Sequence, residues 1–332
     1  MNIQGKSSYH EVHARSLADP QGFWAEAAKE IDWIEPPKTI FDASQGTYGR
    51  WFSGGVVNTC YNALDRHVER GRADQVALIH DSPLTGSITR LTYAELLGEV
   101  QALGAIMQDF GVAQGDRVIL YMPMVPEAVV AMLACARIGA VHSVVFGGFA
   151  AKELATRIDD AQPKLILSAS CGIEPGRIVQ YKPLLDEAIR LAGSKPKACI
   201  VLQRPQLTCD LAPGRDYDWA SLRRKAINDG RKAPCVPVAA TDPLYILYTS
   251  GTTGIPKGVV RDNGGHLVAV KWSMFNLYGV KPGEVWWCGS DIGWVVGHSY
   301  IVYGPLLHGA TSIMYEGKPV GTPDAGAFAG QK

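Results

Sequence analysis

From residue 91 onward, two patterns of apolar positions alternate along the chain. Short continuous apolar runs are separated by segments in which apolar residues recur every three or four positions. The first pattern predicts buried strands and the second predicts amphipathic helices. One helix is expected to begin at Thr92, which forms a capping-box sequence with Glu95, and to end near Gly111. The other predicted elements are strands at 117–122, 141–146, 165–168, 198–202 and 244–248, and helices at 126–138, 152–160, 184–191 and 265–278.

This alternation predicts an α/β fold of layered, mostly parallel sheets flanked by helices, because parallel strands need helical crossovers that cover both faces of the sheet. Residues 204–241 are rich in Pro, Gly and charge and show no clear period, so a long loop or subdomain connection is expected there. Residues 1–60 are aromatic and turn-rich. We therefore expect two parts, an N-terminal segment (1–90) that wraps onto a core and a larger domain (91–332).

Composition excludes several classes of protein. The 332 residues are 47% hydrophobic, and 32 Lys and Arg balance 32 Asp and Glu, which argues against a disordered chain and against a basic nucleic-acid binder. The longest apolar stretch, at 128–146, is interrupted by Arg137 and His142, so no membrane span is expected. Seven cysteines are scattered singly and the N-terminus has no apolar signal core, which favours reduced thiols in the cytoplasm.

A loop after the strand at 244–248 combines glycines, hydroxyls and a lysine, from Tyr248 to Gly258. Glycine lets backbone N–H groups converge on anionic oxygens, hydroxyls donate further hydrogen bonds, and lysine adds a positive charge, so the loop is a candidate phosphate cradle. It differs from the common P-loop because Pro256 precedes Lys257 and a glycine follows it, which removes the magnesium-binding hydroxyl. The alternative is a polar surface loop.

This loop resembles the signature loop of the acyl-adenylate-forming superfamily. Further segments are similar to short-chain acyl-CoA synthetases, and some are most similar to propionate–CoA ligases. The resemblance runs from about Tyr9 to Phe328. The first group of segments comprises Gly293-Trp294-Val295-Val296-Gly297-His298-Ser299-Tyr300, Tyr303-Gly304-Pro305-Leu306 and Tyr315-Glu316-Gly317. The second group comprises Arg261-Asp262-Asn263-Gly264-Gly265, Val145-Phe146-Gly147-Gly148-Phe149 and Gly321-Thr322-Pro323-Asp324.

The resemblance implies a two-step ligase reaction. A carboxylate, here propionate, attacks the α-phosphorus of ATP and expels pyrophosphate, and CoA then displaces AMP from the acyl-adenylate. ATP, CoA and Mg²⁺ are the implied substrates and metal, with no nucleic acid and no membrane partner. The implied phosphate-binding residues are Thr249, Ser250, Gly251, Thr252, Thr253, Gly254 and Lys257.

Two further sites follow from the resemblance. The implied acyl pocket is lined by Trp294, Val295, Val296 and Gly297. Acetate-activating relatives commonly place Thr at the position of Val296, and a more apolar wall favours an extra methylene by about 1 kcal/mol. The alternative is that the two valines are ordinary core residues. His298 is expected to shape this pocket rather than act as a base, because the substrate carboxylate is already ionised at neutral pH.

The implied CoA-binding loop is Glu174, Pro175, Gly176 and Arg177. In this loop Arg177 could pair with a phosphate, while the acidic Glu174 weakens the electrostatic argument. The alternative is a surface turn with a solvated arginine.

The resemblance also implies that this chain is the N-terminal part of a longer enzyme's large domain. The adenylation lysine and the C-terminal domain of that family have no counterpart in these 332 residues. We therefore expect the chain alone to lack ligase activity and to aggregate through unpaired strand edges. The alternatives are part of an acetate–CoA ligase, or a non-catalytic truncated product that binds a nucleotide or CoA.

Overall fold

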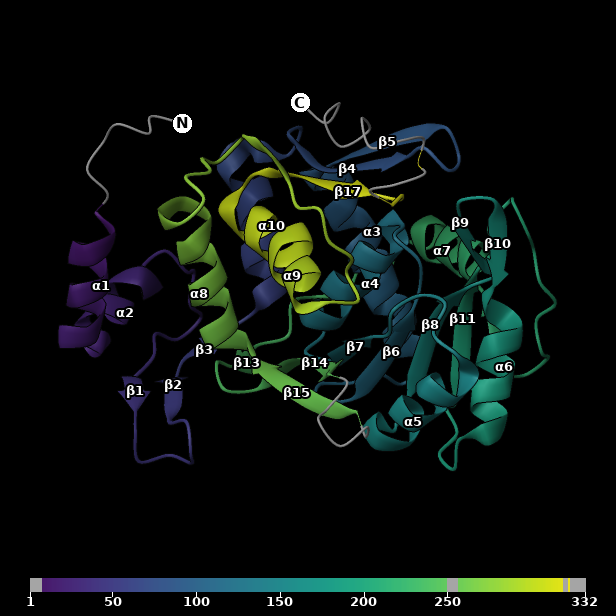
Figure 1. Cartoon of the computed structure of the whole chain (residues 1–332), viewed down its shortest axis with the longest axis horizontal. Helices are drawn as coiled ribbons and strands as arrows, with labels where there is room; N and C mark the ends of the chain where they lie inside the picture. The colour runs from purple at the N-terminus through teal and green to yellow at the C-terminus, as the bar shows by residue number, and fades with distance from the viewer. Residues whose placement is uncertain (1–7, 250–255, 319–321, 323–332) are drawn as a thin grey trace.

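A seven-stranded sheet lies at the centre of the molecule (Figure 1), in a computed structural model that describes residues 8–249, 256–318 and 322. Neighbouring strands are parallel except at one edge, where β14 and β15 are antiparallel. The predicted mostly parallel α/β sheet is therefore confirmed. In spatial order the strands are β12 (Asp216–Asp218), β11 (Ala198–Leu202), β8 (Leu165–Ala169), β6 (Arg117–Tyr121), β7 (Val141–Val144), β14 (Pro243–Thr249) and β15 (Lys257–Asp262).

Helices cover both faces of this sheet, and strand β6 shows why. Its residues alternate between two hydrophobic clusters, with Val118 and Leu120 in one and Ile119 and Tyr121 in the other. Such alternation is expected of a strand that is buried on both sides. The first cluster is covered by α3 (Tyr93–Asp109), α4 (Pro126–Arg137) and α7 (Trp219–Asn228), and the second by α5 (Ala151–Ala161) and α6 (Tyr181–Leu191).

The predicted capping box is present at the start of α3. The Thr92 hydroxyl accepts a hydrogen bond from the Glu95 backbone N–H at 3.2 Å, and the Thr92 N–H donates to Glu95 Oε2 at 2.8 Å. These two bonds satisfy backbone groups that the first turn of a helix leaves without intrahelical partners. The sequence therefore located this helix start correctly.

A second sheet contains four strands and joins distant parts of the chain. In spatial order they are β16 (Val285–Trp287), β17 (Thr311–Tyr315), β4 (Val76–Ser82) and β5 (Ser87–Thr92). Strand β17 pairs in parallel with both β16 and β4, so residues 76–82 lie beside residues 311–315. The division of the chain at residue 90 stays a prediction. Helix α10 (Gly304–His308) and the π-helical η3 (His298–Tyr303) contact β17, and helix α3 contacts β4 and β5. Helices α8 (Asn263–Asn276) and α9 (Val295–Gly297) precede η3 in the chain.

The N-terminal region packs against α8 through aromatic rings. Phe23 and Trp24 lie 5.6 Å and 5.8 Å from Trp272, measured between ring centroids. Aromatic pairs at such separations bury large apolar areas and stabilise the contact. The elements of this region are α1 (Tyr9–Ala18), α2 (Pro20–Ala28), β1 (Thr39–Asp42), β2 (Arg50–Ser53), β3 (Val56–Val57), η1 (Tyr61–Asp65) and η2 (Val68–Arg72).

The prediction of an irregular connection at 204–241 was wrong. This segment contains β12, α7 and the short strand β13 (Val238–Ala239), which pairs with β3. Helix α7 buries only Trp219 and Ala226, so its apolar positions are too few to give a clear helical period. None of the helices in the described parts of the chain is both long and apolar enough to span a bilayer.

Candidate functional site

The candidate phosphate loop connects the two antiparallel edge strands of the central sheet. Thr249 ends β14 and Lys257 begins β15, and the two residues face each other in the register of the pair. Both are exposed. The hairpin thus presents a hydroxyl and an ammonium group at one end of the sheet. The predicted residues Ser250, Gly251, Thr252, Thr253 and Gly254 lie outside the described residues.

A cavity of about 300 Å³ lies beside this hairpin, and its wall includes the buried side chain of Arg157. Arg157 of α5 is 6% exposed and pairs with Glu153 at 3.0 Å. Its guanidinium lies 5.1 Å from the ring centre of Phe149 and 5.4 Å from that of Tyr248, within the range of cation–π attraction. Sequence analysis missed Arg157, because a charged residue in an amphipathic helix is usually on the solvated face.

The four predicted acyl-pocket residues lie together on a short, partly exposed turn. Trp294, Val295 and Val296 are 49%, 41% and 46% exposed, whereas Gly297 is buried. Trp294 lines the cavity beside the phosphate hairpin, and Val295 lines a separate cavity of about 420 Å³. The two valines are therefore partly exposed in this chain, and their role in an acyl pocket stays a prediction. Gly297 packs so closely on the carbonyl of Asp291 that a side chain would clash.

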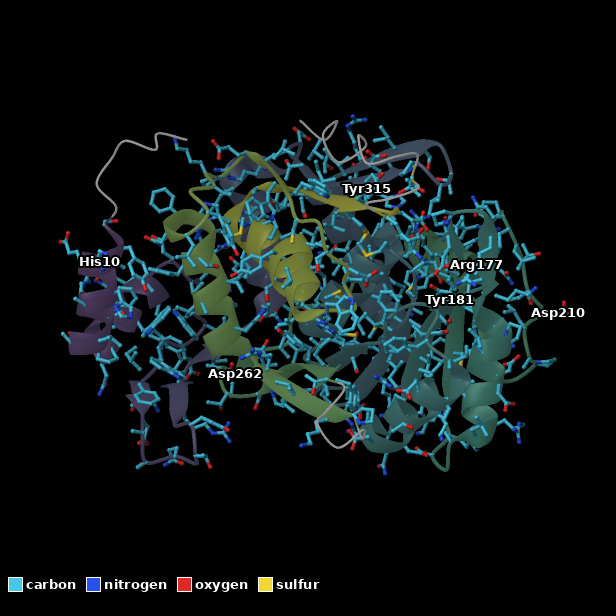
Figure 2. The ribbon with its side chains drawn as sticks, viewed as in Figure 1. His10, Arg177, Tyr181, Asp210, Asp262 and Tyr315 are labelled. Carbon is cyan, nitrogen blue, oxygen red and sulfur yellow. The ribbon has the colours of Figure 1, made fainter. Side chains whose placement is uncertain are left out.

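The cavity at Val295 is largely aromatic and apolar. Its walls also carry Arg261 and Asp262, at the junction of β15 and α8. Figure 2 labels Asp262, which lies near the N-terminal end of α8. The remaining lining residues come mainly from the N-terminal segment and α8, and they are Trp24, Trp51, Phe52, Tyr245, Gly265, His266, Ala269, Val270 and Ser299.

Two buried histidines lie at this cavity, His266 in its wall and His298 against the lining residue Tyr245, and burial favours their uncharged form at neutral pH. Burial lowers the pKa of His266 to about 3 and that of His298 to about 4. The Nδ1 atom of His298 is 3.1 Å from the carbonyl oxygen of Trp294, so the neutral ring can donate a hydrogen bond that holds the turn. Neither ring nitrogen of His266 has a hydrogen-bond partner among the described residues. These positions suit a pocket-shaping role better than proton transfer at neutral pH.

The predicted CoA-binding residues form the turn of a β-hairpin, between β9 (Cys171–Glu174) and β10 (Arg177–Gln180). Arg177 is exposed, and its Nε atom donates to Glu174 Oε2 at 2.7 Å. Lys318 Nζ lies 3.4 Å from the other carboxylate oxygen of Glu174. Partial burial works to raise the pKa of Glu174, but these cations hold it below its usual value. Glu174 therefore balances two cations that could otherwise contact an anion.

Next to this hairpin, the topology of the central sheet creates a crevice. From β6 the chain crosses one face of the sheet to β7, whereas from β8 it crosses the other face to β11, so β6 and β8 flank a switch point of the sheet. Ligands of open α/β sheets commonly bind outside the carboxyl ends of the strands at such a point. A cavity of about 90 Å³ lies there, lined by residues that follow β6, β7 and β8 and by Tyr181, Glu316 and Lys318.

Two glycines beside this crevice leave room for the side chain of Tyr181. Any Cβ atom at Gly147 or Gly172 would lie 2.1 Å or 2.5 Å from the hydroxyl oxygen of Tyr181. Figure 2 shows Tyr181 and Arg177 at the same end of the central sheet. Glycine allows the backbone to approach another group this closely, because it has no side chain. Sequence analysis quoted Gly147 but assigned it no site, and the contact with Tyr181 is visible only in the fold.

Comparison with known proteins agrees with this geometry. Residues 64–329 match the family model described as AMP-binding enzyme, and residues 9–63 match the one described as acetyl-coenzyme A synthetase N-terminus. The chain belongs to the AMP-binding enzyme family. The acetoacetyl-CoA synthetase from Streptomyces lividans has a similar structure, with a TM-score of 0.86 and 27% identity over 97% of this chain and 48% of that one.

Curated relatives of this AMP-binding chain are short-chain acyl-CoA synthetases. The mitochondrial acyl-CoA synthetase short-chain family member 3 of Homo sapiens is 52% identical over 98% of this chain and 47% of its own length. The propionate–CoA ligase of Salmonella typhimurium is 47% identical over 97% of this chain and 50% of its own length. This AMP-binding chain thus spans about half the length of these relatives, and the expected family is confirmed.

Proposed function

We propose that this chain contributes the phosphate, acyl and CoA sites of an AMP-forming short-chain acyl-CoA synthetase that activates propionate. The observation that carries the proposal is the pairing of Thr249 with Lys257 at the end of the central sheet, with separate cavities nearby at Val295 and at the switch point. Adenylation brings a carboxylate anion against the polyanion ATP, so neutralising charge is the main requirement. Lys257 and the loop amides would meet that requirement at the phosphates.

The acyl group is proposed to lie against the turn of Trp294 and Val295. This turn faces apolar and aromatic walls, and the histidines nearby are neutral, so the site offers a short alkyl chain an uncharged surface. No general base is needed in the first step, because a carboxylic acid is ionised at neutral pH. His298 instead acts as a positioning residue through the carbonyl of Trp294.

CoA is proposed to bind along the switch-point crevice and the hairpin of Glu174, Pro175, Gly176 and Arg177. The guanidinium of Arg177 can exchange its exposed bond with Glu174 for a phosphate, because exposed ion pairs contribute little stability.

Mg²⁺ is proposed to arrive with the phosphates of ATP. The described residues contain no cluster of three metal-ligating side chains, and Mg²⁺ is commonly held by substrate phosphates and few protein groups. A cytoplasmic location stays a prediction that rests on the seven free thiols.

A second candidate is an acetate–CoA ligase. The observation in its favour is that residues 9–63 match the model described as acetyl-coenzyme A synthetase N-terminus. Val296 lines neither the cavity at Trp294 nor that at Val295, but it lies on the same turn. By the resemblance to short-chain synthetases it argues for propionate, because a side chain without a hydroxyl favours the additional methylene by about 1 kcal/mol.

The test is an ATP–pyrophosphate exchange assay on the product that the host makes from this gene, at its natural length, with acetate, propionate and butyrate. We expect the highest kcat/KM with propionate, by about fivefold over acetate. The variant Val296→Thr should reduce this preference about fivefold, whereas Val260→Thr, at an exposed position of β15, should leave it unchanged. Preference for acetate would establish the second candidate. Nucleotide binding without exchange for any short acid would indicate a non-catalytic binder.

A further inference from the structure

Two cysteines that are distant in sequence flank one ion pair at the C-terminal end of α4. Arg137 and Asp65 form this pair through two hydrogen bonds of 2.8 Å and 3.0 Å. Arg137 Nη1 also donates to Cys60 Sγ at 3.7 Å, and Cys235 Sγ donates to Asp65 Oδ2 at 3.8 Å. The two sulfur atoms therefore border the same Arg137–Asp65 pair.

The two thiols also interact with each other. The hydrogen-bonding contact of Cys60 raises the pKa of the Cys235 thiol, and burial adds to this effect. Among the described residues, the other cysteines with a shifted pKa have no second thiol close enough to contribute to that shift. Burial is the main cause of the raised pKa of Cys135, Cys171, Cys199, Cys209 and Cys288. This pair is thus distinct from the other free thiols of the chain.

The surroundings give the two sulfurs different roles. Cys60 is completely buried, and Arg137 Nη1 donates a hydrogen bond to its sulfur. Cys235 is partly exposed, so a small reagent in solvent can reach it. A partly exposed sulfur next to a buried sulfur is an arrangement in which the first can be modified and the second can then resolve the adduct.

The backbone around the pair is already held together. The Val236 carbonyl accepts a hydrogen bond from Asn58 Nδ2 at 2.8 Å, and the Ala233 carbonyl accepts one from Arg137 Nε at 2.6 Å. Strand β13 follows Cys235 and pairs with β3, which precedes Cys60. A bond between the sulfurs would therefore join segments whose relative position is fixed, with little backbone movement.

We propose that Cys60 and Cys235 form a reversible disulfide when the protein meets a small disulfide oxidant of the glutathione type. At a pH high enough to remove its proton, the Cys235 sulfur attacks the oxidant, forms a mixed disulfide and releases one thiol. Cys60, after losing its own proton, then attacks Cys235 Sγ, forms the Cys60–Cys235 disulfide and releases the second thiol. Two protein thiols are oxidised and one small disulfide is reduced to two thiols, so atoms and electrons balance.

The expected consequence is a more stable N-terminal segment. The new bond would close a long loop between η1 and the segment before β13, which restricts the unfolded chain more than the folded one. We expect the melting temperature of the oxidised protein to exceed that of the reduced protein by about 5 °C or more. This inference does not depend on the proposed ligase activity.

The test is to treat the purified protein with oxidised glutathione, alkylate the remaining thiols and digest the protein without reduction. We expect a linked peptide pair carrying Cys60 and Cys235, the raised melting temperature, and reversal of both by dithiothreitol. Cys235→Ser should abolish both effects. Cys209→Ser, at another partly exposed thiol, should keep them.

Three results would overturn the proposal. The first is alkylation of both Cys60 and Cys235 after denaturation of the oxidised protein. The second is a stable glutathione adduct at Cys235 without a linked pair. The third is a linked pair with no change in melting temperature. Because Cys235 is partly exposed and serine is nearly isosteric, the variant should fold, and its reduced melting temperature is the check.

Discussion

Two glutamates, Glu316 and Glu174, each pair with an arginine, but one pair is buried and the other is exposed. Glu316 pairs with Arg204 through two hydrogen bonds of 2.7 Å and 3.0 Å, with side chains only 4% and 7% exposed, and it accepts a third bond from Ser82 at 2.8 Å. Glu174 pairs with Arg177, which is 69% exposed, and with Lys318.

The difference in burial predicts a structural role for the buried pair and a binding role for the exposed pair. A buried charge that loses its partner is strongly destabilising, so Arg204 and Glu316 hold β17 and β4 to the segment after β11. An exposed pair contributes little stability and its members can exchange partners with an anionic ligand. A buried and an exposed pair of the same residue types are therefore expected to respond to mutation to very different extents.

The largest effect is expected from Arg204→Met, which leaves Glu316 buried without its counter-charge. We expect the free energy of unfolding to fall by about 3–5 kcal/mol, measured by urea denaturation. The double variant with Glu316→Met should recover a large part of the loss, because the uncompensated charge is gone. A loss below about 1 kcal/mol in the single variant would remove the contrast between the two pairs.

A smaller loss of stability is expected from the buried histidines when the pH is lowered. The folded pKa of His298 is about 4, below the ordinary value of 6.5, because burial disfavours the charged ring. As the pH falls below 6.5 the unfolded chain binds a proton that the folded ring does not, so stability should decrease by about 2 kcal/mol for such a ring by pH 5. Urea denaturation at pH 7 and pH 5 measures this loss.

Two variants test the assignment to His298. His298→Asn should reduce the pH-dependent loss, whereas His10→Asn, on the exposed helix α1, should leave it unchanged. An identical pH dependence in all three proteins would show that the proton uptake occurs elsewhere.

Lys257→Gln tests an exposed charge that is proposed to bind phosphate. We expect stability close to that of the unchanged protein, because the side chain is exposed at the start of β15. The affinity for ATP, measured by calorimetry, should fall about tenfold, since a charge-assisted hydrogen bond is lost. Lys281→Gln is the matched control at an exposed position away from the hairpin. An unchanged ATP affinity in Lys257→Gln would argue against the phosphate site.

A small change in stability is also expected at the exposed pair. Arg177→Gln and Glu174→Gln should each alter the free energy of unfolding by no more than about 0.5 kcal/mol. Their effects on CoA affinity should have opposite signs, because Arg177 would contact the anion and Glu174 competes for Arg177. Equal effects of the two variants on CoA binding would argue against this site.

Local signals predicted those elements whose own sequence carries strong periodicity or a cap. The strands at 117–122 and 165–168, the capped helix at Thr92 and the helix at 126–138 were found within a few residues of their observed bounds. Strand β15 and helix α7 were missed, because an exposed edge strand and a mostly exposed helix show little apolar alternation. The candidate phosphate loop was recognised from its residue types. Strand β15, which follows it, was not predicted, because its positions are mostly exposed.

The sequence by itself determined the family, the α/β class and the segments expected to bind phosphate, acyl group and CoA, because those properties depend on residues that are close together in the chain. The tertiary structure decided which distant residues meet: Arg157 with Tyr248, Gly147 with Tyr181, Arg204 with Glu316, and Cys60 with Cys235 near Arg137. It also decided which charges are buried. Burial sets the cost of an unpaired charge and the pKa of a ring, and both depend on packing between elements that no local pattern records.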